Sequence, residues 1–119
     1  MFKIKYFLDK SQIHGIGLFA NQNIQEGNIV YVHNKDLDKI ISQDEFERLE
    51  LEEKRIFKHY GYFNPQEGVW RLDHDDIRFC NHSENSNITL VNGKIIAKRN
   101  IKRGEELLQD YSEFGGLIE

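Results

Sequence analysis

The chain has 119 residues and a mass of 14.1 kDa, the size of a single domain with one hydrophobic core. Hydrophobic residues make up 39% and charged residues 30%, which excludes a disordered chain, and the single cysteine excludes an intramolecular disulfide and a cysteine-rich zinc cluster. No apolar run reaches the ~18 residues of a membrane span and the N-terminus does not resemble a signal peptide, so we expect an intracellular protein. The net charge of −4 disfavours non-specific nucleic-acid binding and suits a cationic partner.

The first third of the chain predicts short strands around a glycine-rich turn. Residues 2–7 alternate between large apolar side chains and lysines, a pattern typical of a half-buried strand. Residues 14–20, His-Gly-Ile-Gly-Leu-Phe-Ala, form a turn that leads into an apolar stretch. Residues 29–32 are β-branched or aromatic, which predicts a further strand.

A helical insert is predicted over about residues 42–60. Ser42 and Glu45 have the spacing of a capping box, in which each side chain bonds to the other residue's backbone N–H. Pro65, the only proline, follows the predicted helix and favours a break there. The residues expected to face the core are Phe46, Leu49, Ile56, Phe57 and Tyr60, and those expected to face water are Glu50, Glu52 and Glu53.

The rest of the chain again predicts strands. Residues 69–72 are a short apolar run. Residues 87–91 and 94–97 flank an Asn-Gly pair, the strongest short signal of a β-hairpin, because both turn residues must take positive φ. Residues 107–111 predict a last strand. We therefore expect a mostly β fold with one or two short helices.

One sequence pattern occurs twice. Ala-x-x-Asn-Ile-x-x-Gly begins at Ala20 and again at Ala97, an offset of 77 residues (97 − 20). Each copy predicts a strand, a tight turn closed by Gly27 or Gly104, and another strand. Two copies are too few for a solenoid, so we interpret them as one hairpin design used twice, with a functional duplication as the alternative.

Three segments carry residues able to take part in chemistry. The Gly-x-Gly of residues 14–20 lets a ligand approach the backbone closely, although alone it is typical of a plain turn. Residues 78–87, Arg-Phe-Cys-Asn-His-Ser-Glu-Asn-Ser-Asn, are dense in short hydrogen-bonding side chains, which also occur in ordinary loops. Residues 104–111, Gly-Glu-Glu-Leu-Leu-Gln-Asp-Tyr, contain two glutamates typical of a solvated turn and end at Tyr111, which can orient an amine.

In this order and spacing, the three segments resemble the motifs of the SET-domain protein lysine methyltransferases. The resemblance spans nearly the whole chain and implies one SET domain over residues 1–119, with its middle motif at 78–87 and its C-terminal motif at 104–111. It implies a β-clip-like fold of small sheets, in which the C-terminal segment threads under the middle motif as a pseudoknot. Two residues depart from the family pattern: Ser86 replaces a proline, and Glu84 stands where many members have cysteine.

The resemblance also implies a site for S-adenosylmethionine, which leaves as S-adenosylhomocysteine, and a catalytic role for Tyr111. The substrate lysine would enter from the opposite face through a narrow channel, for which Tyr60 and Tyr62 are candidate walls. The residues expected to bind the cofactor are His14, Gly15, Ile16, Gly17, Asn81, His82, Tyr111 and Phe114.

The implied chemistry is consistent with these residues. The cofactor supplies an electrophilic methyl group, and the protein aligns it with the amine. The lysine must be neutral, and a dry channel beside a sulfonium cation lowers its pKa from about 10.4. We expect no metal, since no recognised ligand spacing is present. The family's cysteine-rich segment after the domain is absent, so Phe114 or a second copy of the chain, as a homodimer, would cover the cofactor.

The acidic balance suits a lysine-rich protein substrate, such as a histone or another basic protein. Candidate docking residues are Asp73, Asp75 and Asp76, with an ordinary solvated face as the alternative. We expect no direct contact with nucleic acid or membrane. A bacterial source would place the chain in the cytoplasm, and a viral source in a host nucleus.

Three other interpretations compete with this one. The first keeps the fold as a catalytically weak SET-like scaffold or protein-binding module. The second is a nucleic-acid binder that uses the cluster Lys98, Arg99, Lys102 and Arg103. The third is a metalloenzyme that uses the histidines, namely His14, His33, His59, His74 and His82, whose spacings match no recognised ligand pattern.

Overall fold

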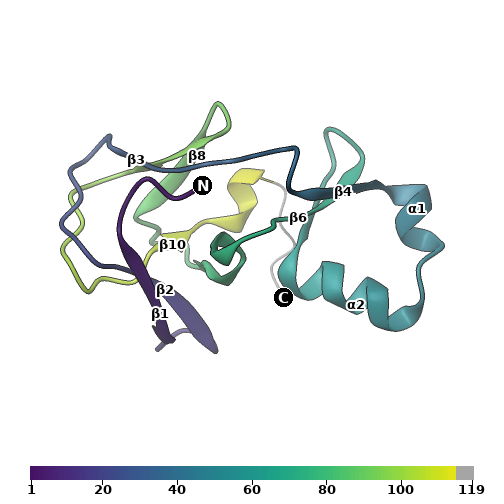
Figure 1. The fold of residues 1–119 in the computed structure, drawn as a ribbon, viewed down its shortest axis with the longest axis horizontal. Coiled ribbons are helices and arrows are strands. Elements are labelled where there is room, and N and C mark those ends of the chain that lie inside the picture. The colour runs from purple at the N-terminus through teal and green to yellow at the C-terminus, as the bar shows by residue number, and fades with distance from the viewer. Residues whose placement is uncertain (115–119) are drawn as a thin grey trace.

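The computed structural model describes residues 1–114, and of Phe114 only the backbone. Figure 1 shows a half built from strands of the N- and C-terminal parts of the chain, and a second half that carries both α-helices. The second half is the continuous insert 39–72, which leaves and rejoins the first half by two connections. Within the described residues, no helix has the length and apolar character needed to cross a membrane.

The first half contains three small sheets, as the mostly β expectation requires. An antiparallel hairpin and a three-stranded sheet in the order β3-β9-β8 lie beside the parallel pair β7 and β10. Asn92 and Gly93 both have positive φ between β8 and β9, which confirms the predicted hairpin. The elements are β1 (Tyr6–Lys10), β2 (Ile16–Ala20), β3 (Ile29–Val32), η1 (Asp76–Phe79), β7 (Asn81–His82), β8 (Ile88–Val91), β9 (Lys94–Ala97), β10 (Leu108–Gln109) and η2 (Tyr111–Phe114).

The strand predicted over residues 2–7 lies further along the chain. β1 begins at Tyr6 and pairs with β2, whereas Phe2 forms only an isolated bridge with Tyr31. The first residues bond instead to the end of β3, through the backbone of Lys3 and the N-terminal amine. The predicted alternation is nevertheless correct, because Phe2, Ile4 and Tyr6 all pack against the core.

The insert contains a three-stranded sheet in the order β4-β6-β5, covered by two helices. The capping box of Ser42 and Glu45 is present, and the predicted helical insert contains two helices rather than one continuous helix: α1 ends before Arg48, and Glu50 starts a second capping box. Ile56 was predicted to face the core, but it is 48% exposed. The elements are β4 (Lys39–Ser42), α1 (Gln43–Glu47), α2 (Leu51–Tyr60), β5 (Tyr62–Asn64) and β6 (Val69–Leu72).

Each half has its own apolar core. In the insert, Trp70 stacks on Phe46 with ring centroids 4.1 Å apart, and Phe57 and Ile41 complete the cluster. The larger core lies between the sheets of the first half, and its fully buried members come from β2, β3, β8 and β9 and from the loops that join them. Its largest members are Leu18, Ile24, Tyr31, Ile88, Ile95, Ile101 and Leu107.

The two copies of the repeated sequence pattern contact each other with approximate twofold symmetry. Ile24 and Ile101, the central residues of the copies, exchange two backbone hydrogen bonds of 2.8 Å. The amide of Gly27 donates to Ala97, and that of Gly104 donates to Ala20. Both glycines have positive φ, as predicted. The interpretation as one hairpin design used twice agrees with this arrangement.

Candidate active site

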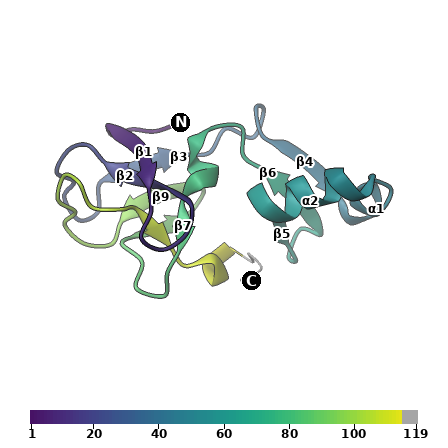
Figure 2. The same cartoon turned by 90° about the horizontal axis from the view of Figure 1, so that it is seen from below.

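The C-terminal motif passes between β2 and the loop that follows β7. The amide of Leu107 donates to Leu18 on one side, while β10 pairs in parallel with β7 on the other, with Leu108 opposite Asn81. Figure 2 shows the yellow C-terminal segment beside β7. The side chain of Asn87 closes the loop over this segment. Its Nδ2 donates to the backbone carbonyl of Glu106, and its Oδ1 accepts from the backbone amide of Leu108, both at 2.8 Å. This is the expected pseudoknot.

The side chain of Asn81 ties the middle motif to the glycine-rich turn. Its amide nitrogen lies 2.9 Å from the carbonyl oxygen of His14 and 3.2 Å from that of Ile16. It also lies 3.0 Å from a carboxylate oxygen of Glu106. Asn81 therefore brings all three motif segments into contact and fixes the backbone of residues 14–16.

Glu106 is a residue whose role the sequence pattern did not reveal. Its carboxylate accepts hydrogen bonds from Asn81 in the middle motif and from Ser11 (2.8 Å), which precedes the glycine-rich turn. Gly17 leaves room for it, since a Cβ at that position would lie 2.4 Å from the carboxylate. Glu105, by contrast, contacts Arg99 on the surface, as a solvated turn residue does.

His82 and Tyr111 lie side by side, although 29 residues separate them in sequence (111 − 82). The backbone amide of Tyr111 donates to Nδ1 of His82 at 3.1 Å, which leaves the imidazole proton on Nε2. The two ring centroids are 5.1 Å apart. The position of Tyr111 is therefore set by β10, the strand that precedes Tyr111 and pairs with β7.

The hydroxyl of Tyr111 donates a hydrogen bond to the carbonyl oxygen of Cys80. Burial raises the pKa of this hydroxyl far above its ordinary value, and the neighbouring Cys80 acts in the same direction. The group therefore stays protonated at every physiological pH. It serves as a fixed, neutral polar group rather than as a base.

Comparison with known proteins decides the family. The SET domain model matches residues 15–112, which span all three motifs. The chain belongs to the SET domain family. The motif resemblance is thereby confirmed, and the small sheets and the pseudoknot agree with the expected fold.

Relatives of this SET domain are much longer proteins. A histone-lysine N-methyltransferase of Kluyveromyces lactis, H3 lysine-36 specific, is 34% identical over 115 residues, which cover 87% of this chain and 16% of that protein. The N-lysine methyltransferase KMT5A-A of Danio rerio is 31% identical over 112 residues, which cover 83% of this chain and 33% of that protein. This SET domain thus spans less than half the length of either relative.

Solved structures of a fungal complex are similar in fold. The Chaetomium thermophilum Polycomb Repressive Complex 2 matches with a TM-score of 0.70 and 34% identity, covering 91% of this chain and 15% of that chain. The same complex in an autoinhibited conformation bound to S-adenosylmethionine matches with a TM-score of 0.69 and 32% identity, covering 94% and 16%.

The glycine-rich turn of this SET domain presents an exposed surface next to Asn81. His14, Gly15 and Ile16 are exposed, and the Ile16 side chain is 52% exposed despite being apolar. Gly15 has positive φ (48°). Phe114 ends η2, and its side chain lies outside the described part of the structure, as do residues 115–119.

The two candidate channel residues lie on different surfaces of the SET domain. Tyr62 lines a groove of ≈ 690 Å³ between the β5–β6 hairpin, the β8–β9 hairpin and the start of η2, next to Tyr111. Burial raises the pKa of Tyr62 to about 12, and Asp73 adds to the shift. Tyr60 packs against Phe79 and Arg78 instead and lines a smaller depression of ≈ 320 Å³.

The aspartates proposed as a docking surface point inward. Asp75 accepts hydrogen bonds from the Tyr31 hydroxyl at 2.8 Å, and Asp76 accepts one from the Tyr6 hydroxyl at 2.8 Å. Asp73 is 8% exposed. The expectation of a docking surface is therefore wrong for these three residues, because buried or half-buried hydroxyls and ring nitrogens lie beside them.

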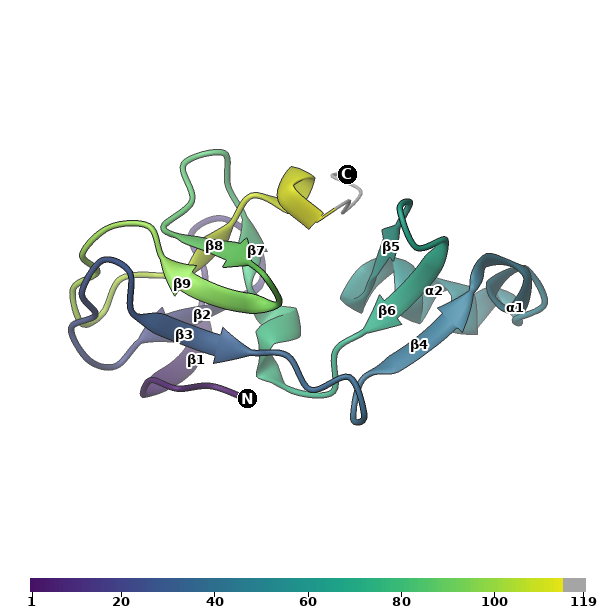
Figure 3. The same ribbon diagram turned by 90° about the horizontal axis from the view of Figure 1, so that it is seen from above.

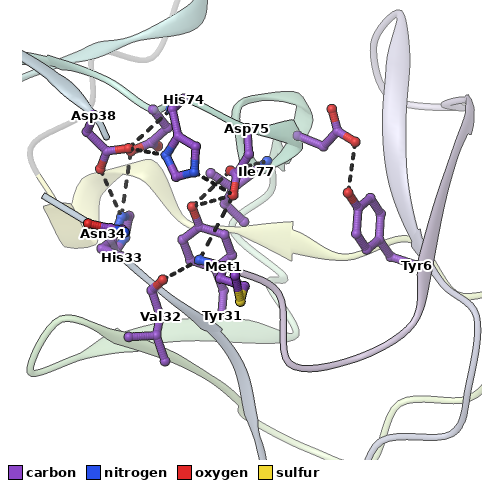
Figure 4. A network of polar contacts seen from close by, with 12 residues as sticks. Met1, Tyr6, Tyr31, Val32, His33, Asn34, Asp38, His74, Asp75 and Ile77 are labelled. Atoms are coloured by element: carbon purple, nitrogen blue, oxygen red, sulfur yellow. Dashed lines mark hydrogen bonds and ion pairs between the residues drawn. The ribbon is translucent and has the colours of Figure 1, made fainter. Parts of the chain in front are cut away.

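His74 and Asp38 extend this polar network toward the insert (Figure 4). Both the backbone amide and the ring Nδ1 of His74 contact the same oxygen of Asp38, at 3.1 and 2.7 Å. Burial acts to raise the pKa of Asp38, but these hydrogen bonds from His74 hold it below its ordinary value. His33 lies on the other side of the same carboxylate (Figure 4).

Proposed function

We propose that this SET domain transfers a methyl group from S-adenosylmethionine to the side-chain amine of a lysine in a protein substrate. The observation that carries the proposal is the placement of Tyr111 beside Asn81 and His82 by the β7–β10 pair. The relatives' names support it, since they are histone-lysine or protein-lysine methyltransferases. The bound S-adenosylmethionine of the Polycomb Repressive Complex 2 structure supports the choice of cofactor.

The cofactor would lie on the exposed face formed by the glycine-rich turn and the middle motif. This face fits such a molecule, because the turn of residues 14–16 is exposed, carries the apolar Ile16, and is held in one conformation by the bonds from Asn81 to the His14 and Ile16 carbonyls. The residues proposed to hold the cofactor are His14, Gly15, Ile16, Gly17, Asn81, His82, Tyr111 and Phe114. When bound, the sulfonium supplies an electrophilic methyl group.

Tyr111 acts by position. Its hydroxyl, anchored on the Cys80 carbonyl, holds the lysine nitrogen in line with the methyl carbon, and such alignment contributes several kcal/mol to catalysis. Because Tyr111 remains protonated, the proton on the incoming ammonium must be lost to solvent or to another base before transfer. Low dielectric surroundings favour the neutral amine and so assist that loss.

The groove beside Tyr111 is the proposed approach for the substrate. Tyr62 forms part of its wall, and charges of both signs line it, namely Glu67 and Glu113 together with Lys35, Arg71 and Lys94. The net charge of −4 and the name of the Kluyveromyces lactis relative, a histone-lysine N-methyltransferase, support a histone tail or another basic protein as the substrate. A histone substrate would place the reaction in a nucleus, and a basic bacterial protein would place it in a cytoplasm. Residues after η2 or a second copy of the chain would complete the cover over the cofactor.

Calorimetric titration with S-adenosylmethionine tests the cofactor site. We expect saturable binding to one site per chain, weakened at least about tenfold by Asn81→Ala, because this change releases the His14 and Ile16 carbonyls. Asn85→Ala is a matched control in the same loop, since its side chain is exposed. Wild-type binding by Asn81→Ala would contradict the proposed site.

Single-turnover methylation of a lysine-rich substrate tests the role of Tyr111. We expect Tyr111→Phe to retain cofactor binding and to lose activity by about a hundredfold or more, because the hydroxyl no longer orients the amine. Tyr60→Phe is the control, because Tyr60 lies on another surface. An unchanged single-turnover rate in Tyr111→Phe would overturn the assignment.

A further inference from the structure

Three buried polar atoms converge where the insert joins the first half of the molecule. Nδ1 of His33 lies 3.6 Å from Oδ1 of Asp73 and 3.9 Å from Oδ2 of Asp38. All three atoms lie within 4.8 Å of one another. The Asp38 side chain is fully buried, and the side chains of Asp73 and His33 are 10% and 11% exposed.

None of these three atoms has a hydrogen-bond partner among residues 1–114. The separations of 3.6 and 3.9 Å exceed the 2.7–3.2 Å or so of a hydrogen bond to nitrogen. A buried polar atom without a partner costs about 1–3 kcal/mol, and more when it is charged. Three such atoms that face one another indicate a ligand that binds all of them.

We propose that His33, Asp38 and Asp73 bind a divalent transition-metal ion, with zinc as the best match. Imidazole nitrogen and carboxylate oxygens are ligands that zinc accepts, at about 2.0–2.2 Å. A tetrahedral ion at that distance from each atom separates its ligands by about 3.3–3.6 Å. The 3.6 Å between His33 and Asp73 fits this geometry, and the 3.9 Å between His33 and Asp38 requires a side-chain shift of a few tenths of an ångström. Two carboxylates balance the charge of the ion.

The residues around the cluster already orient its ligands. His74 occupies the other oxygen of Asp38 with two hydrogen bonds and leaves Oδ2 directed at His33 (Figure 4). The His33 ring packs edge-on against Tyr31, with centroids 5.1 Å apart. Such support of metal ligands by neighbouring hydrogen bonds is a regular feature of metal sites. His33 also lines the ≈ 690 Å³ groove, through which water can supply a fourth ligand.

The position of the cluster indicates a structural role for the ion. His33 follows β3, Asp38 precedes β4 and Asp73 follows β6, so the ligands belong to the two connections between the halves. Figure 3 shows these connections as the two chain segments that cross between the halves. An ion bound there would hold the insert, with the Tyr62 wall of the groove, at a fixed position. The proposed methyl transfer itself still requires no metal.

Metal titration of the full chain tests this proposal independently of methyl transfer. After chelator treatment, we expect one zinc ion per chain by calorimetry, and cobalt(II) to bind with visible absorption bands typical of a low-coordinate site. Zinc should also raise the Tm. The Asp73→Asn and His33→Gln variants should each weaken binding at least about tenfold and lose the Tm increase.

Two controls separate this site from weak surface binding. Asp36→Asn changes an exposed carboxylate in the same connection, and His59→Gln removes an exposed histidine of α2, so both should bind zinc like the wild type. The fluorescence of Trp70, the only tryptophan, checks that each variant folds. Absence of zinc binding by the wild type overturns the proposal. This is the result expected if His33 is protonated and pairs with the two aspartates. Unchanged binding by folded Asp73→Asn overturns the proposal as well.

Discussion

Glu106 links the three motif segments through one carboxylate. It accepts hydrogen bonds from Ser11 and Asn81 and fills the space that Gly17 leaves free. Hydrogen bonds to a charged group contribute about 1.5–3 kcal/mol each when they are well shielded from water. The half-buried Glu106 should therefore stabilise the fold and keep the glycine-rich turn in place for a ligand.

We expect Glu106→Ala to lower the free energy of unfolding by about 1–3 kcal/mol, because Ser11 and Asn81 lose their shared acceptor. Binding of S-adenosylmethionine should weaken as well. Glu84→Ala is the control, with an expected loss below about 0.5 kcal/mol, since Glu84 is an exposed carboxylate of the middle motif. Urea unfolding and calorimetry measure both effects, and equal losses in the two variants would contradict this view.

The sequence distinguishes poorly between two neighbouring glutamates. Glu105 and Glu106 both have the pattern of solvated turn charges, and only the tertiary contact with Gly17 separates them. Asn81 and Tyr111, in contrast, could be placed side by side from their motifs. The cluster of His33, Asp38 and Asp73 could not, because its members are 5 and 35 residues apart (38 − 33, 73 − 38) and follow no compact spacing.

At the scale of elements, the two copies of the repeated pattern stabilise each other. The side chain of Asn100 accepts from the amide of Glu26 at 2.8 Å, and Asn23 accepts from the amide of Arg103 at 2.9 Å. These two bonds are equivalent under the 77-residue offset (100 − 23, 103 − 26). Each asparagine thus closes the turn of the other copy.

We expect Asn23→Ala and Asn100→Ala to lower the free energy of unfolding by similar amounts, about 0.5–1.5 kcal/mol each, because each removes one equivalent hydrogen bond. Urea unfolding of both variants, with exposed Asn85→Ala as a control outside the repeat, measures this. A loss of stability in only one of the two variants would contradict this prediction, because it would show that the two hydrogen bonds contribute unequally to the free energy of unfolding.

Local signals were sufficient to predict the repeat, the Asn-Gly hairpin and the capping box. The pairing of one copy with the other was not predictable. It joins residues 77 apart through backbone hydrogen bonds, which do not depend on particular side chains and so leave no signal in the sequence. The split between α1 and α2 was missed for a different reason. Glu50 and Glu53 form a second capping box, but both resemble ordinary water-facing helix residues.

At the scale of the whole molecule, the two cores are separate units joined by two connections. The Trp70 cluster belongs to the insert, and the Tyr31 cluster belongs to the first half. Polar groups, rather than apolar side chains, occupy the junction, including the buried Asp38 and Asp73 and the more exposed His74 that bonds to Asp38. The relative position of the halves, and with it the width of the groove, therefore depends on electrostatic contacts.

Tyrosines in both halves make the stability of the molecule sensitive to alkaline pH. Burial raises the pKa of Tyr6 and Tyr62 to about 12, and raises those of Tyr31 and Tyr111 further. The unfolded chain ionises its tyrosines near pH 10. Native tyrosines with raised pKa values contribute stability that is fully present below about pH 10 and is lost as the pH rises through the native pKa values.

We therefore expect the contribution of the buried tyrosines to the free energy of unfolding to stay constant up to about pH 10. Above that pH it should fall by about 1.4 kcal/mol per pH unit for each protected tyrosine. Urea midpoints between about pH 8 and pH 11 measure this fall, and tyrosinate absorption should appear together with unfolding rather than before it. Tyr31→Phe removes one protected hydroxyl and should reduce the slope by one proton, although the loss of its bond to Asp75 lowers stability at every pH. Early ionisation of most tyrosines in the folded chain would contradict the protection, because the buried hydroxyls of Tyr31 and Tyr111 would then be open to water.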